Sequence, residues 1–279
     1  MRDLPQGCVS YDTELRSPVE VDLRFPVAIG EGVAQTSLIA PGKAQQLVKC
    51  FKQIRLQLAL RRVTAYRAVA TAAFRKSNNG ANVAEQIFSQ TGIHIETISG
   101  QEEATLSMLS LLAQGKNVQT PLLLADVGGL STDLSLYRGK GSELVGWSFD
   151  VGTLRTPETP RYSAALSDYT HRLALLGSRY PQLKLVATGG SIHHLGKLWG
   201  SNKSLLTLQA CIDCISELTP LSLEQRCLRY HLSPLRSQTM TRGALIYRLL
   251  MEQTRKTRVI APVIGIRHGI CCSLAGFTL

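Results

Sequence analysis

The sequence predicts a mixed α/β fold, because short apolar runs typical of strands alternate with longer segments of helical periodicity. The clearest strand is the apolar run at 122–125, which a Gly-rich turn connects to a second strand at 133–137. A helix is predicted after Pro41, where apolar residues recur at helical spacing as Leu47, Phe51, Ile54 and Leu58. A length of 279 residues suffices for two domains of ordinary size.

The amino-terminal half is expected to form the first domain, residues 1–118. Asn82 with Glu85 resembles a capping box, which predicts the start of a helix that ends at Gly92. The other elements expected in this half are strands and turns before residue 41, a buried strand at 63–69, a strand at 94–98 and a helix from residue 101.

The carboxyl-terminal half, residues 119–279, is expected to form the second domain, entered through a short linker at 119–121. Its predicted hairpin is followed by further strands and helices separated by Gly and Pro. These are a strand at 143–150, a helix at 160–176, a strand at 184–187, helices at 205–218, 223–230 and 242–252, a strand at 259–264 and a Gly-rich turn at 265–269.

The charge of the chain favours a polyanionic partner. The formal net charge is +11, from 31 Lys and Arg against 20 Asp and Glu. Such an excess suits a phosphate-rich substrate, a nucleic acid or an anionic lipid surface. The basic residues look dispersed, and no aromatic RNA-binding pattern or helix-turn-helix signature accompanies them, so a specific nucleic-acid partner is not expected.

Targeting and cysteine content indicate a cytoplasmic protein with reduced thiols. No apolar run approaches the ~18 residues of a membrane span, and the amino terminus lacks the apolar core of a signal peptide. The seven cysteines are an odd number. Cys211 and Cys214 have metal-ligand spacing, but a pair on the apolar face of a helix is more typical of core packing.

The turn of the predicted hairpin carries a pattern that suits phosphate. Asp126 ends the first strand, and the turn contains Gly128, Gly129, Ser131 and Thr132. Glycine allows an anion to approach backbone N–H groups closely, and a neighbouring carboxylate suits Mg²⁺ held to a phosphate. An ordinary hairpin turn is the alternative, since the motif is short.

Two other segments carry candidate functional residues. Gly189, Gly190 and Ser191 follow a predicted strand and precede a predicted helix, an arrangement that suits phosphate binding. Glu102 and Glu103 lie in the first turn of a predicted helix. Carboxylates commonly stabilise helix N-termini, so from the residues alone this pair has a structural explanation as well as a catalytic one.

Six segments together resemble the exopolyphosphatase and guanosine pentaphosphate phosphohydrolase family, of the actin-like, sugar-kinase and Hsp70 ATPase superfamily. They occur in the family's order and spacing, from about residue 24 to the carboxyl terminus. The segments are 69–75 with Asn79, 91–104, 126–133, 188–191, 221–226 and 265–269.

The resemblance implies two RNase H-like lobes flanking a cleft, with the first lobe shortened at its amino terminus. The implied activity is Mg²⁺-dependent release of terminal phosphate from inorganic polyphosphate or from a guanosine pentaphosphate-type nucleotide. Glu103 matches the family's catalytic glutamate, which orients and deprotonates the attacking water. Arg75 and Asn79 match residues that line the phosphate site, and Asp126 matches the Mg²⁺-associated aspartate. A phosphoanhydride needs little more than a positioned water, a base and neutralised charge.

Two departures from the family pattern define the alternatives. Family members begin with a D-x-G-S-N phosphate loop, which is not recognisable in residues 1–23, and Leu130 stands where the family has a third Gly. If that position needed a positive φ, Leu would cost about 1–2 kcal/mol and would crowd the turn. A slow hydrolase is the leading prediction, and a non-catalytic phosphate- or polyphosphate-binding relative is the alternative.

A third class, an actin-like ATPase or sugar kinase, would need an adenosine-binding turn, for which Gly189 and Gly190 are candidates. The segment 99–104 favours the phosphatase branch. The partners expected are therefore polyphosphate or a phosphorylated guanosine nucleotide, with a homodimer as the candidate assembly and no membrane partner.

Overall fold

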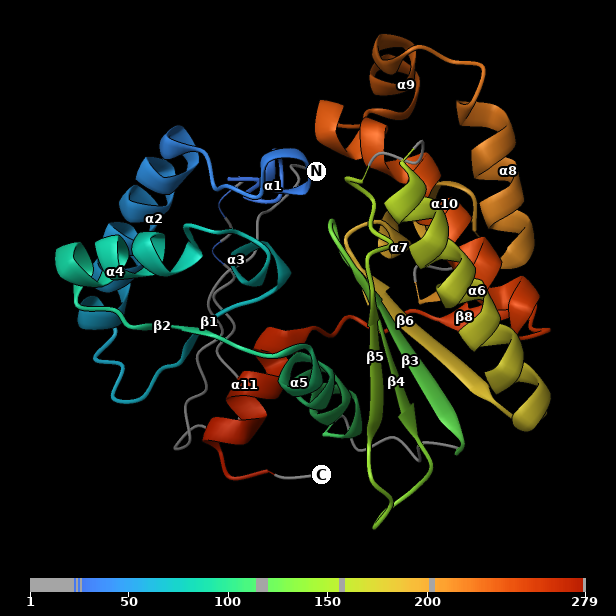
Figure 1. The fold of residues 1–279 in the computed structure, drawn as a ribbon, viewed down its shortest axis with the longest axis horizontal. Coiled ribbons are helices and arrows are strands. Elements are labelled where there is room, and N and C mark those ends of the chain that lie inside the picture. The colour runs from blue at the N-terminus through green and yellow to red at the C-terminus, as the bar shows by residue number, and fades with distance from the viewer. Residues whose placement is uncertain are drawn as a thin grey trace. The chain divides into compact units, whose positions relative to one another are not determined.

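The computed structural model describes Leu23, Phe25 and residues 27–113, 120–155, 159–200 and 204–277 (Figure 1). The strands expected before residue 23, the region in which a D-x-G-S-N loop was sought and Gln119 of the 119–121 linker lie outside the described residues. The chain forms two compact units. Unit 1 comprises Met1–Ala113 and Ile266–Leu279, and unit 2 comprises Gln114–Gly265. These units differ from the expected ranges, 1–118 and 119–279, chiefly because the carboxyl-terminal segment belongs to unit 1.

Unit 1 is mainly helical around a two-stranded parallel sheet, β1–β2. Its elements are α1 (Val33–Thr36), α2 (Pro41–Leu60), β1 (Ala68–Ala70), α3 (Ala72–Arg75), α4 (Gly80–Thr91), β2 (Ile95–Thr97), α5 (Gly100–Leu112) and α11 (Ile266–Leu274). Ser99 caps α5, because its hydroxyl accepts the Glu102 N–H at 3.1 Å. Gly92 ends α4 in the left-handed conformation, as predicted, with φ 69°.

The last helix corrects the expectation of a Gly-rich turn at 265–269. Residues 266–274 form α11, which packs against α5. A Cβ atom at Gly269 would overlap the backbone carbonyl of Leu106, so glycine permits the close approach of the two helices. Ile270 packs with Leu106 and Ile98 in the same apolar cluster. This contact joins residues far apart in the sequence, and local periodicity carries no signal of it.

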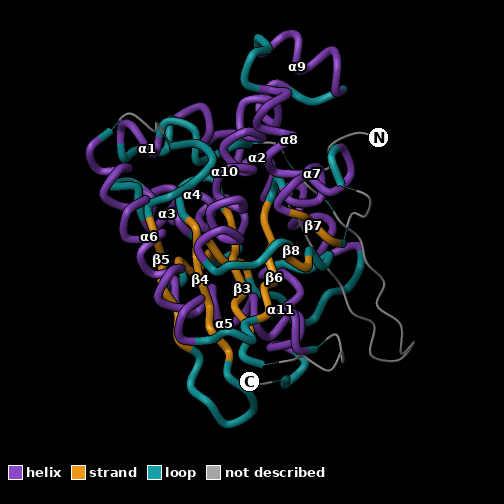
Figure 2. The backbone as a smooth tube through the Cα atoms, turned by 90° about the vertical axis from the view of Figure 1, so that its right-hand side faces the viewer, coloured by secondary structure: helices purple, strands orange, loops and turns teal. Residues whose placement is uncertain are grey.

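Unit 2 is built on a six-stranded mixed sheet of order β5-β4-β3-β6-β8-β7. Figure 2 shows strands β5, β4, β3, β6 and β8 of this sheet side by side. The strands are β3 (Leu122–Val127), β4 (Thr132–Tyr137), β5 (Val145–Phe149), β6 (Lys184–Gly189), β7 (Leu205–Thr207) and β8 (Arg258–Ile260). The helices are α6 (Pro160–Arg179), α7 (Ile192–Leu198), α8 (Leu208–Leu218), α9 (Leu223–Tyr230) and α10 (Pro234–Gln253).

The core of unit 2 explains why the strands of the hairpin are apolar. Leu123, Ala125 and Leu134 are fully buried in one cluster with residues of α6, α8 and α10. Cys211 and Cys214 are also fully buried there, and burial raises the pKa of both thiols, so they pack as apolar residues and match the core-packing interpretation. Strand β3 is antiparallel to β4 and parallel to β6, which brings the carboxyl ends of β3 and β6 to one edge of the sheet.

Several boundaries differ from those expected. The stretch 63–69 is strand only from residue 68, where β1 pairs with the three residues of β2. Helix α4 begins at Gly80, two residues before the predicted capping box at Asn82. Residues 205–207 form β7 rather than the start of the predicted helix. The helix begins after Thr207, because the Thr207 hydroxyl caps it by accepting the Ala210 N–H at 3.2 Å. Helix α10 is longer than predicted, and β8 is shorter.

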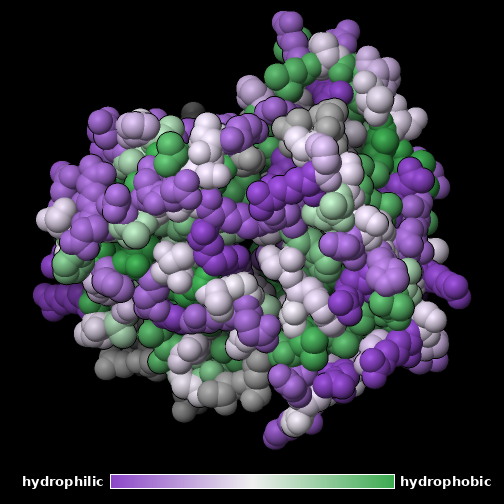
Figure 3. All heavy atoms as spheres, in the orientation of Figure 1, coloured by the Kyte–Doolittle hydropathy of each residue, from purple (hydrophilic) through white to green (hydrophobic). Residues whose placement is uncertain are grey.

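Surface hydropathy agrees with the absence of any predicted membrane segment. Among the helices described, none combines the length and the apolarity that crossing a bilayer requires. In the view of Figure 3, hydrophilic and hydrophobic residues are interspersed over the visible face. This finding bears on spanning helices and says nothing about binding at a lipid surface.

Candidate active site

The hairpin turn between β3 and β4 is the centre of the candidate site in unit 2. The Gly128 N–H donates to the Ser131 carbonyl at 2.9 Å and closes a tight turn. Two hydroxyls of the turn are used internally. Ser131 Oγ donates to Asp133 Oδ2 at 3.2 Å, and Thr132 Oγ1 donates to the Val151 carbonyl at 2.6 Å. The turn is therefore shaped by its own hydrogen bonds before any ligand binds.

The carbonyls of Gly128, Gly129 and Leu130 all accept hydrogen bonds from the loop that follows β5. The Thr153 N–H donates to the Gly128 carbonyl at 3.1 Å, and the Leu154 N–H donates to the Gly129 carbonyl at 2.8 Å. Arg155 Nε donates to the Leu130 carbonyl at 2.6 Å. By contrast, the N–H groups of Gly129 and Leu130 donate to no group among the described residues. Open backbone donors beside carbonyls that are already satisfied are an arrangement that suits an anion.

Two residues of that loop fix its position against the turn. A Cβ atom at Gly152 would overlap the Gly129 carbonyl, so glycine is needed for the close approach. Arg155 also pairs with Asp150, with 2.9 Å between Nη2 and Oδ1. Burial lowers the pKa of the Arg155 guanidinium, and the charge of Asp150 opposes this effect. This ion pair joins the end of the strand predicted at 143–150 to the loop that follows it.

Leu130 does not strain the turn. Its φ is not among the positive φ values of the described non-glycine residues, and its side chain is 4% exposed. The expected cost of Leu where the family has Gly therefore does not arise, because the position adopts an ordinary conformation and the side chain packs inward. Leu130 stabilises the loop that it was expected to crowd.

Leu130→Ala is expected to reduce the free energy of unfolding by about 2–5 kcal/mol, as truncation of a buried Leu does. Leu130→Gly should destabilise the fold at least as much and should not tighten phosphate binding. Denaturant unfolding with isothermal titration of tripolyphosphate checks both statements. Tighter binding by Leu130→Gly would contradict this account of the turn.

A row of polar side chains crosses the sheet beside the turn. The strand register pairs Asp126 of β3 with Asp133 of β4 on one side and with Thr188 of β6 on the other. Paired residues present their side chains on the same face of a sheet. Partial burial and the charge of Asp133 raise the pKa of Asp126 to about 6, and the Thr188 side chain opposes the shift. One carboxyl group of this row thus titrates close to neutral pH.

The polar row fits a Mg²⁺ site of the type that the family implies. Mg²⁺ prefers oxygen ligands and is usually held by one or two carboxylates, with water and substrate phosphate completing its shell. Asp126 and Asp133 supply two carboxylates, and the buried Thr188 side chain lies beside Asp126 in the strand register. The described residues contain no group of three or more metal-binding side chains, which a metal held by protein alone would require.

The second Gly-rich turn lies at the same edge of the sheet, since Gly189 pairs in register with Val127. Gly189 has φ 125°, and a Cβ atom there would overlap the Val127 carbonyl. Tyr247 Oη donates to the Thr188 carbonyl at 2.9 Å, and Arg236 Nη1 donates to the Gly190 carbonyl. The register therefore brings together the two turns that the sequence predicts to bind phosphate. These are residues 128–132 and residues 189–191, the last of which is Ser191.

Unit 1 contains the candidate base. Glu103 lies in the first turn of α5, and its side chain is 12% exposed. Arg75, at the end of α3, donates through Nη1 to Glu103 Oε2 at 2.9 Å and to the Ile98 carbonyl at 2.8 Å. The neighbouring Glu102 instead pairs with Arg67. These two neighbouring carboxylates thus have different partners.

Asn79 has a structural role that the sequence did not indicate. Its Nδ2 donates to the Ile39 carbonyl at 2.9 Å, and its Oδ1 accepts the Ile39 N–H at 2.8 Å. The side chain therefore ties the segment before α2 to the start of α4. Its predicted contact with phosphate stays a prediction.

Comparison with known proteins places these features in a family. The model of the Ppx/GppA phosphatase family matches residues 18–276. Exopolyphosphatase 2 of Mycobacterium tuberculosis is 24% identical over 289 residues, covering 90% of this chain and 87% of that protein. A bifunctional 3-dehydroquinate synthase/phosphatase of Fusobacterium nucleatum is 25% identical over 153 residues, and the match covers 54% of this chain and 22% of that protein.

Solved structures agree on the fold. The crystal structure of an exopolyphosphatase from Cytophaga hutchinsonii superposes with a TM-score of 0.76 at 17% identity, covering 97% of this chain and 94% of that chain. A Ppx/GppA family member from Aquifex aeolicus gives a TM-score of 0.70 at 20% identity, covering 93% and 90%. The family resemblance and the mixed α/β fold predicted from the sequence are confirmed. The chain belongs to the Ppx/GppA phosphatase family.

Proposed function

We propose that this protein hydrolyses the terminal phosphoanhydride bond of inorganic polyphosphate or of a guanosine pentaphosphate-type nucleotide, with Mg²⁺ as its cofactor. The observation that carries the proposal is the 128–131 turn, whose carbonyls are occupied while the N–H groups of Gly129 and Leu130 stay open beside the Asp126–Asp133 pair. Phosphoryl transfer depends on positioning and on charge neutralisation, and this arrangement supplies both. The matched Exopolyphosphatase 2 supports the substrate class.

The roles follow from the chemistry of the bond. Glu103 takes a proton from the attacking water, whose oxygen bonds to the terminal phosphorus as the bridging P–O bond breaks and the shortened chain leaves. Arg75 holds the Glu103 carboxylate through the 2.9 Å contact and adds positive charge near it.

Asp126 and Asp133 would hold the metal, with Thr188 Oγ1 as a further oxygen ligand or as a donor to its water. Bound Mg²⁺ supplies positive charge that offsets the phosphate oxygens. Deprotonation of Asp126 is the part that this chain must provide, and a pKa of about 6 leaves that carboxyl group mostly ionised above neutral pH.

A second candidate function is phosphate or polyphosphate binding without hydrolysis. The ion pair between Glu103 and Arg75 favours it, because a carboxylate held by a guanidinium is a weaker base than a free one. In that case unit 2 would still bind phosphate through the turn, and only the water-activating step would be missing.

Purified protein is expected to release phosphate from polyphosphate or from guanosine pentaphosphate when Mg²⁺ is present and to stop when EDTA is added. Binding should weaken steeply with salt, as screening of a polyanion requires. A colorimetric phosphate assay with both substrates, at several salt concentrations, makes the measurement. Salt-sensitive binding without any release would support the binding function, and neither binding nor release at low salt would contradict both.

A further inference from the structure

Helix α2 and its flanks form the most basic part of the chain. Residues 32–84 contain no Asp or Glu, so the positive charge is not dispersed as the sequence first suggested. The same stretch contains nine basic residues, Lys43, Lys49, Lys52, Arg55, Arg61, Arg62, Arg67, Arg75 and Lys76. Such an acid-free stretch concentrates positive potential on one part of unit 1.

Three of these basic residues are neutralised by nearby acids. Lys43 pairs with Glu31 at 2.9 Å, and the acidic partners of Arg67 and Arg75 lie on β2 and α5. Five others have no ion pair within the described residues, and all five are exposed. These five, here named the α2 cation face, are Lys49, Lys52, Arg55, Arg61 and Arg62.

The α2 cation face is long enough for an extended ligand. Its members span 14 positions on α2 and the residues that follow its end, which corresponds to about 20 Å at 1.5 Å per helical residue. Exposed cations held this close repel one another, and a bound polyanion would relieve the repulsion by displacing their counterions. Residues 32–84 contain no acidic side chain that could relieve this repulsion.

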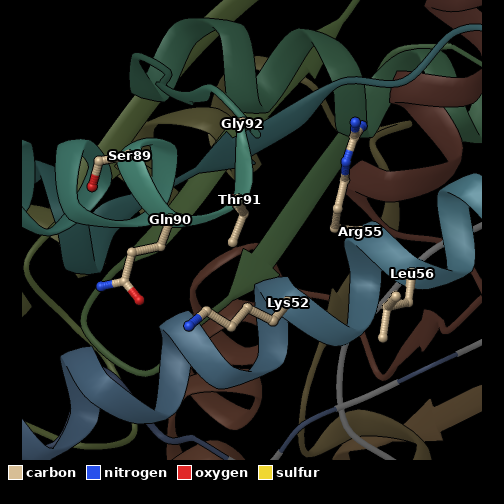
Figure 4. A pocket seen from close by; sticks show the side chains of 7 residues that line it. All are labelled: Lys52, Arg55, Leu56, Ser89, Gln90, Thr91 and Gly92. Carbon is tan, nitrogen blue, oxygen red and sulfur yellow. The ribbon is translucent and has the colours of Figure 1, made fainter.

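A pocket lies along this face, between α2 and the carboxyl end of α4 (Figure 4). Its volume is about 410 Å³, and its lining residues are Lys52, Arg55, Leu56, Ser89, Gln90, Thr91 and Gly92. Lys52 and Gln90 extend toward the same side of the pocket in Figure 4. A guanidinium, an ammonium and an amide are all donors to anionic oxygen, so the pocket matches the charge of a phosphate group.

We propose that the α2 cation face binds a stretch of inorganic polyphosphate chain away from the bond being cut, so that the protein retains long chains better than short ones. The inference rests on the proposed function for the choice of polyanion. The surface itself is defined independently, by charge, exposure and the pocket at Lys52 and Arg55.

Polyphosphate suits this face better than the other polyanions. Single-stranded nucleic acids bind through aromatic side chains that stack on bases, whereas the only aromatic residue of α2, Phe51, is partly buried. Leu56 and Leu60 are 63% and 76% exposed on the same helix, a feature shared with helices that lie on anionic bilayers. Two isolated leucines bury little apolar area, so a lipid surface is kept as an outcome of the test.

The test compares two triple variants in a Glu103→Gln background, where binding can be measured without turnover. The first combines Lys49→Ala, Lys52→Ala and Arg55→Ala. The matched control combines Arg138→Ala, Lys140→Ala and Lys184→Ala, which removes the same charge from exposed residues of unit 2. Thermal melting establishes that both variants are folded.

The α2 variant is expected to bind polyphosphate of several hundred units at least about tenfold more weakly than the control. The slope of log affinity against log salt concentration should be less steep by about 2, because each lost phosphate contact contributes about 0.7. Binding of tripolyphosphate should be the same in both. Equal losses in the two variants, or an equal loss for tripolyphosphate, would overturn the inference. A larger loss of binding to oligo-RNA or to phosphatidylserine vesicles than to polyphosphate would replace polyphosphate with that partner.

Failure of this inference is distinguishable from failure of the proposed function. In the wild-type background, the α2 variant should raise the KM for long polyphosphate and leave release from tripolyphosphate unchanged. An unchanged KM for long chains, with hydrolysis intact, overturns the α2 site alone. If the protein releases no phosphate but its binding of long chains still depends on the α2 cation face, the proposed hydrolysis is overturned and the proposed α2 site is supported.

Discussion

Glu103→Gln is expected to slow Mg²⁺-dependent phosphate release by about 10²–10⁴, the usual contribution of a general base. Binding of polyphosphate should change little, because Gln keeps the size of the side chain and its hydrogen bond to Arg75. The stability cost should stay near ~0.5 kcal/mol, the contribution of one carboxylate at a helix N-terminus. Single-turnover phosphate release at saturating substrate, with binding measured by titration, separates the two effects.

Glu102→Gln is the matched control. Glu102 occupies the same first turn of α5 but pairs with Arg67 rather than with Arg75. The Glu102→Gln variant should be slightly less stable than the wild type and should release phosphate at the wild-type rate. Equal, non-zero rates in wild type and in Glu103→Gln would clear Glu103 of the catalytic role and leave it as a helix-capping carboxylate.

Asp126→Asn is expected to remove the Mg²⁺ response and to lower the rate by about 10²–10³, the range seen when one charge-stabilising group is lost. A readout apart from activity is thermal stability at pH 8. Mg²⁺ should raise the melting temperature of the wild type by binding the folded state, and it should leave Asp126→Asn unchanged. Asp168→Asn, on the exposed surface of α6, controls for the loss of one charge.

The pH dependence of stability tests the same residue without metal. The folded-state pKa of Asp126, about 6, lies above the ordinary aspartate value of 3.8, so the folded protein keeps this proton where the unfolded chain has lost it. The contribution of Asp126 to stability is therefore present below pH 4 and is lost as the pH rises from about 4 to 6. Asp126→Asn should flatten that part of the profile. Identical profiles in wild type and variant would contradict the raised pKa.

The local parts of the site could be predicted from the sequence. The strand that ends at Asp126, the Gly128–Gly129 turn and the turn at Gly189 follow from apolar runs and from glycine, which act over a few residues. The resemblance singled out Glu103, but the difference between its ion pair and that of Glu102 could not be predicted. It depends on Arg67 and Arg75, which are distant in the sequence and reach α5 only through the β1–β2 pairing.

Hydrogen bonds between side chains and backbone carbonyls are the main feature of the site that could not be predicted from the sequence. Arg155 acts on the turn through the Leu130 carbonyl, and Asn79 acts on Ile39 through both of its amide atoms. No residue-type pattern identifies a carbonyl partner, because every residue has one. The effect of Leu130 on the turn was predicted wrongly for a related reason. A family pattern gives the residue type expected at a position but does not give the φ of that position.

The return of α11 to unit 1 has a consequence for the order in which the two units can form as the chain is made. Unit 2 is one continuous stretch, whereas unit 1 is divided between residues made first and residues made last. A chain halted at Gly265 would contain all of unit 2, while Ile98 and Leu106 beside Glu103 would lack the cover of Ile270. Domains fold as units during synthesis, with the amino-terminal one usually first. Unit 1 carries the proposed catalytic base and is complete only after α11 is made, so under the proposed function a chain halted at Gly265 would bind phosphate through unit 2 and lack a finished unit 1.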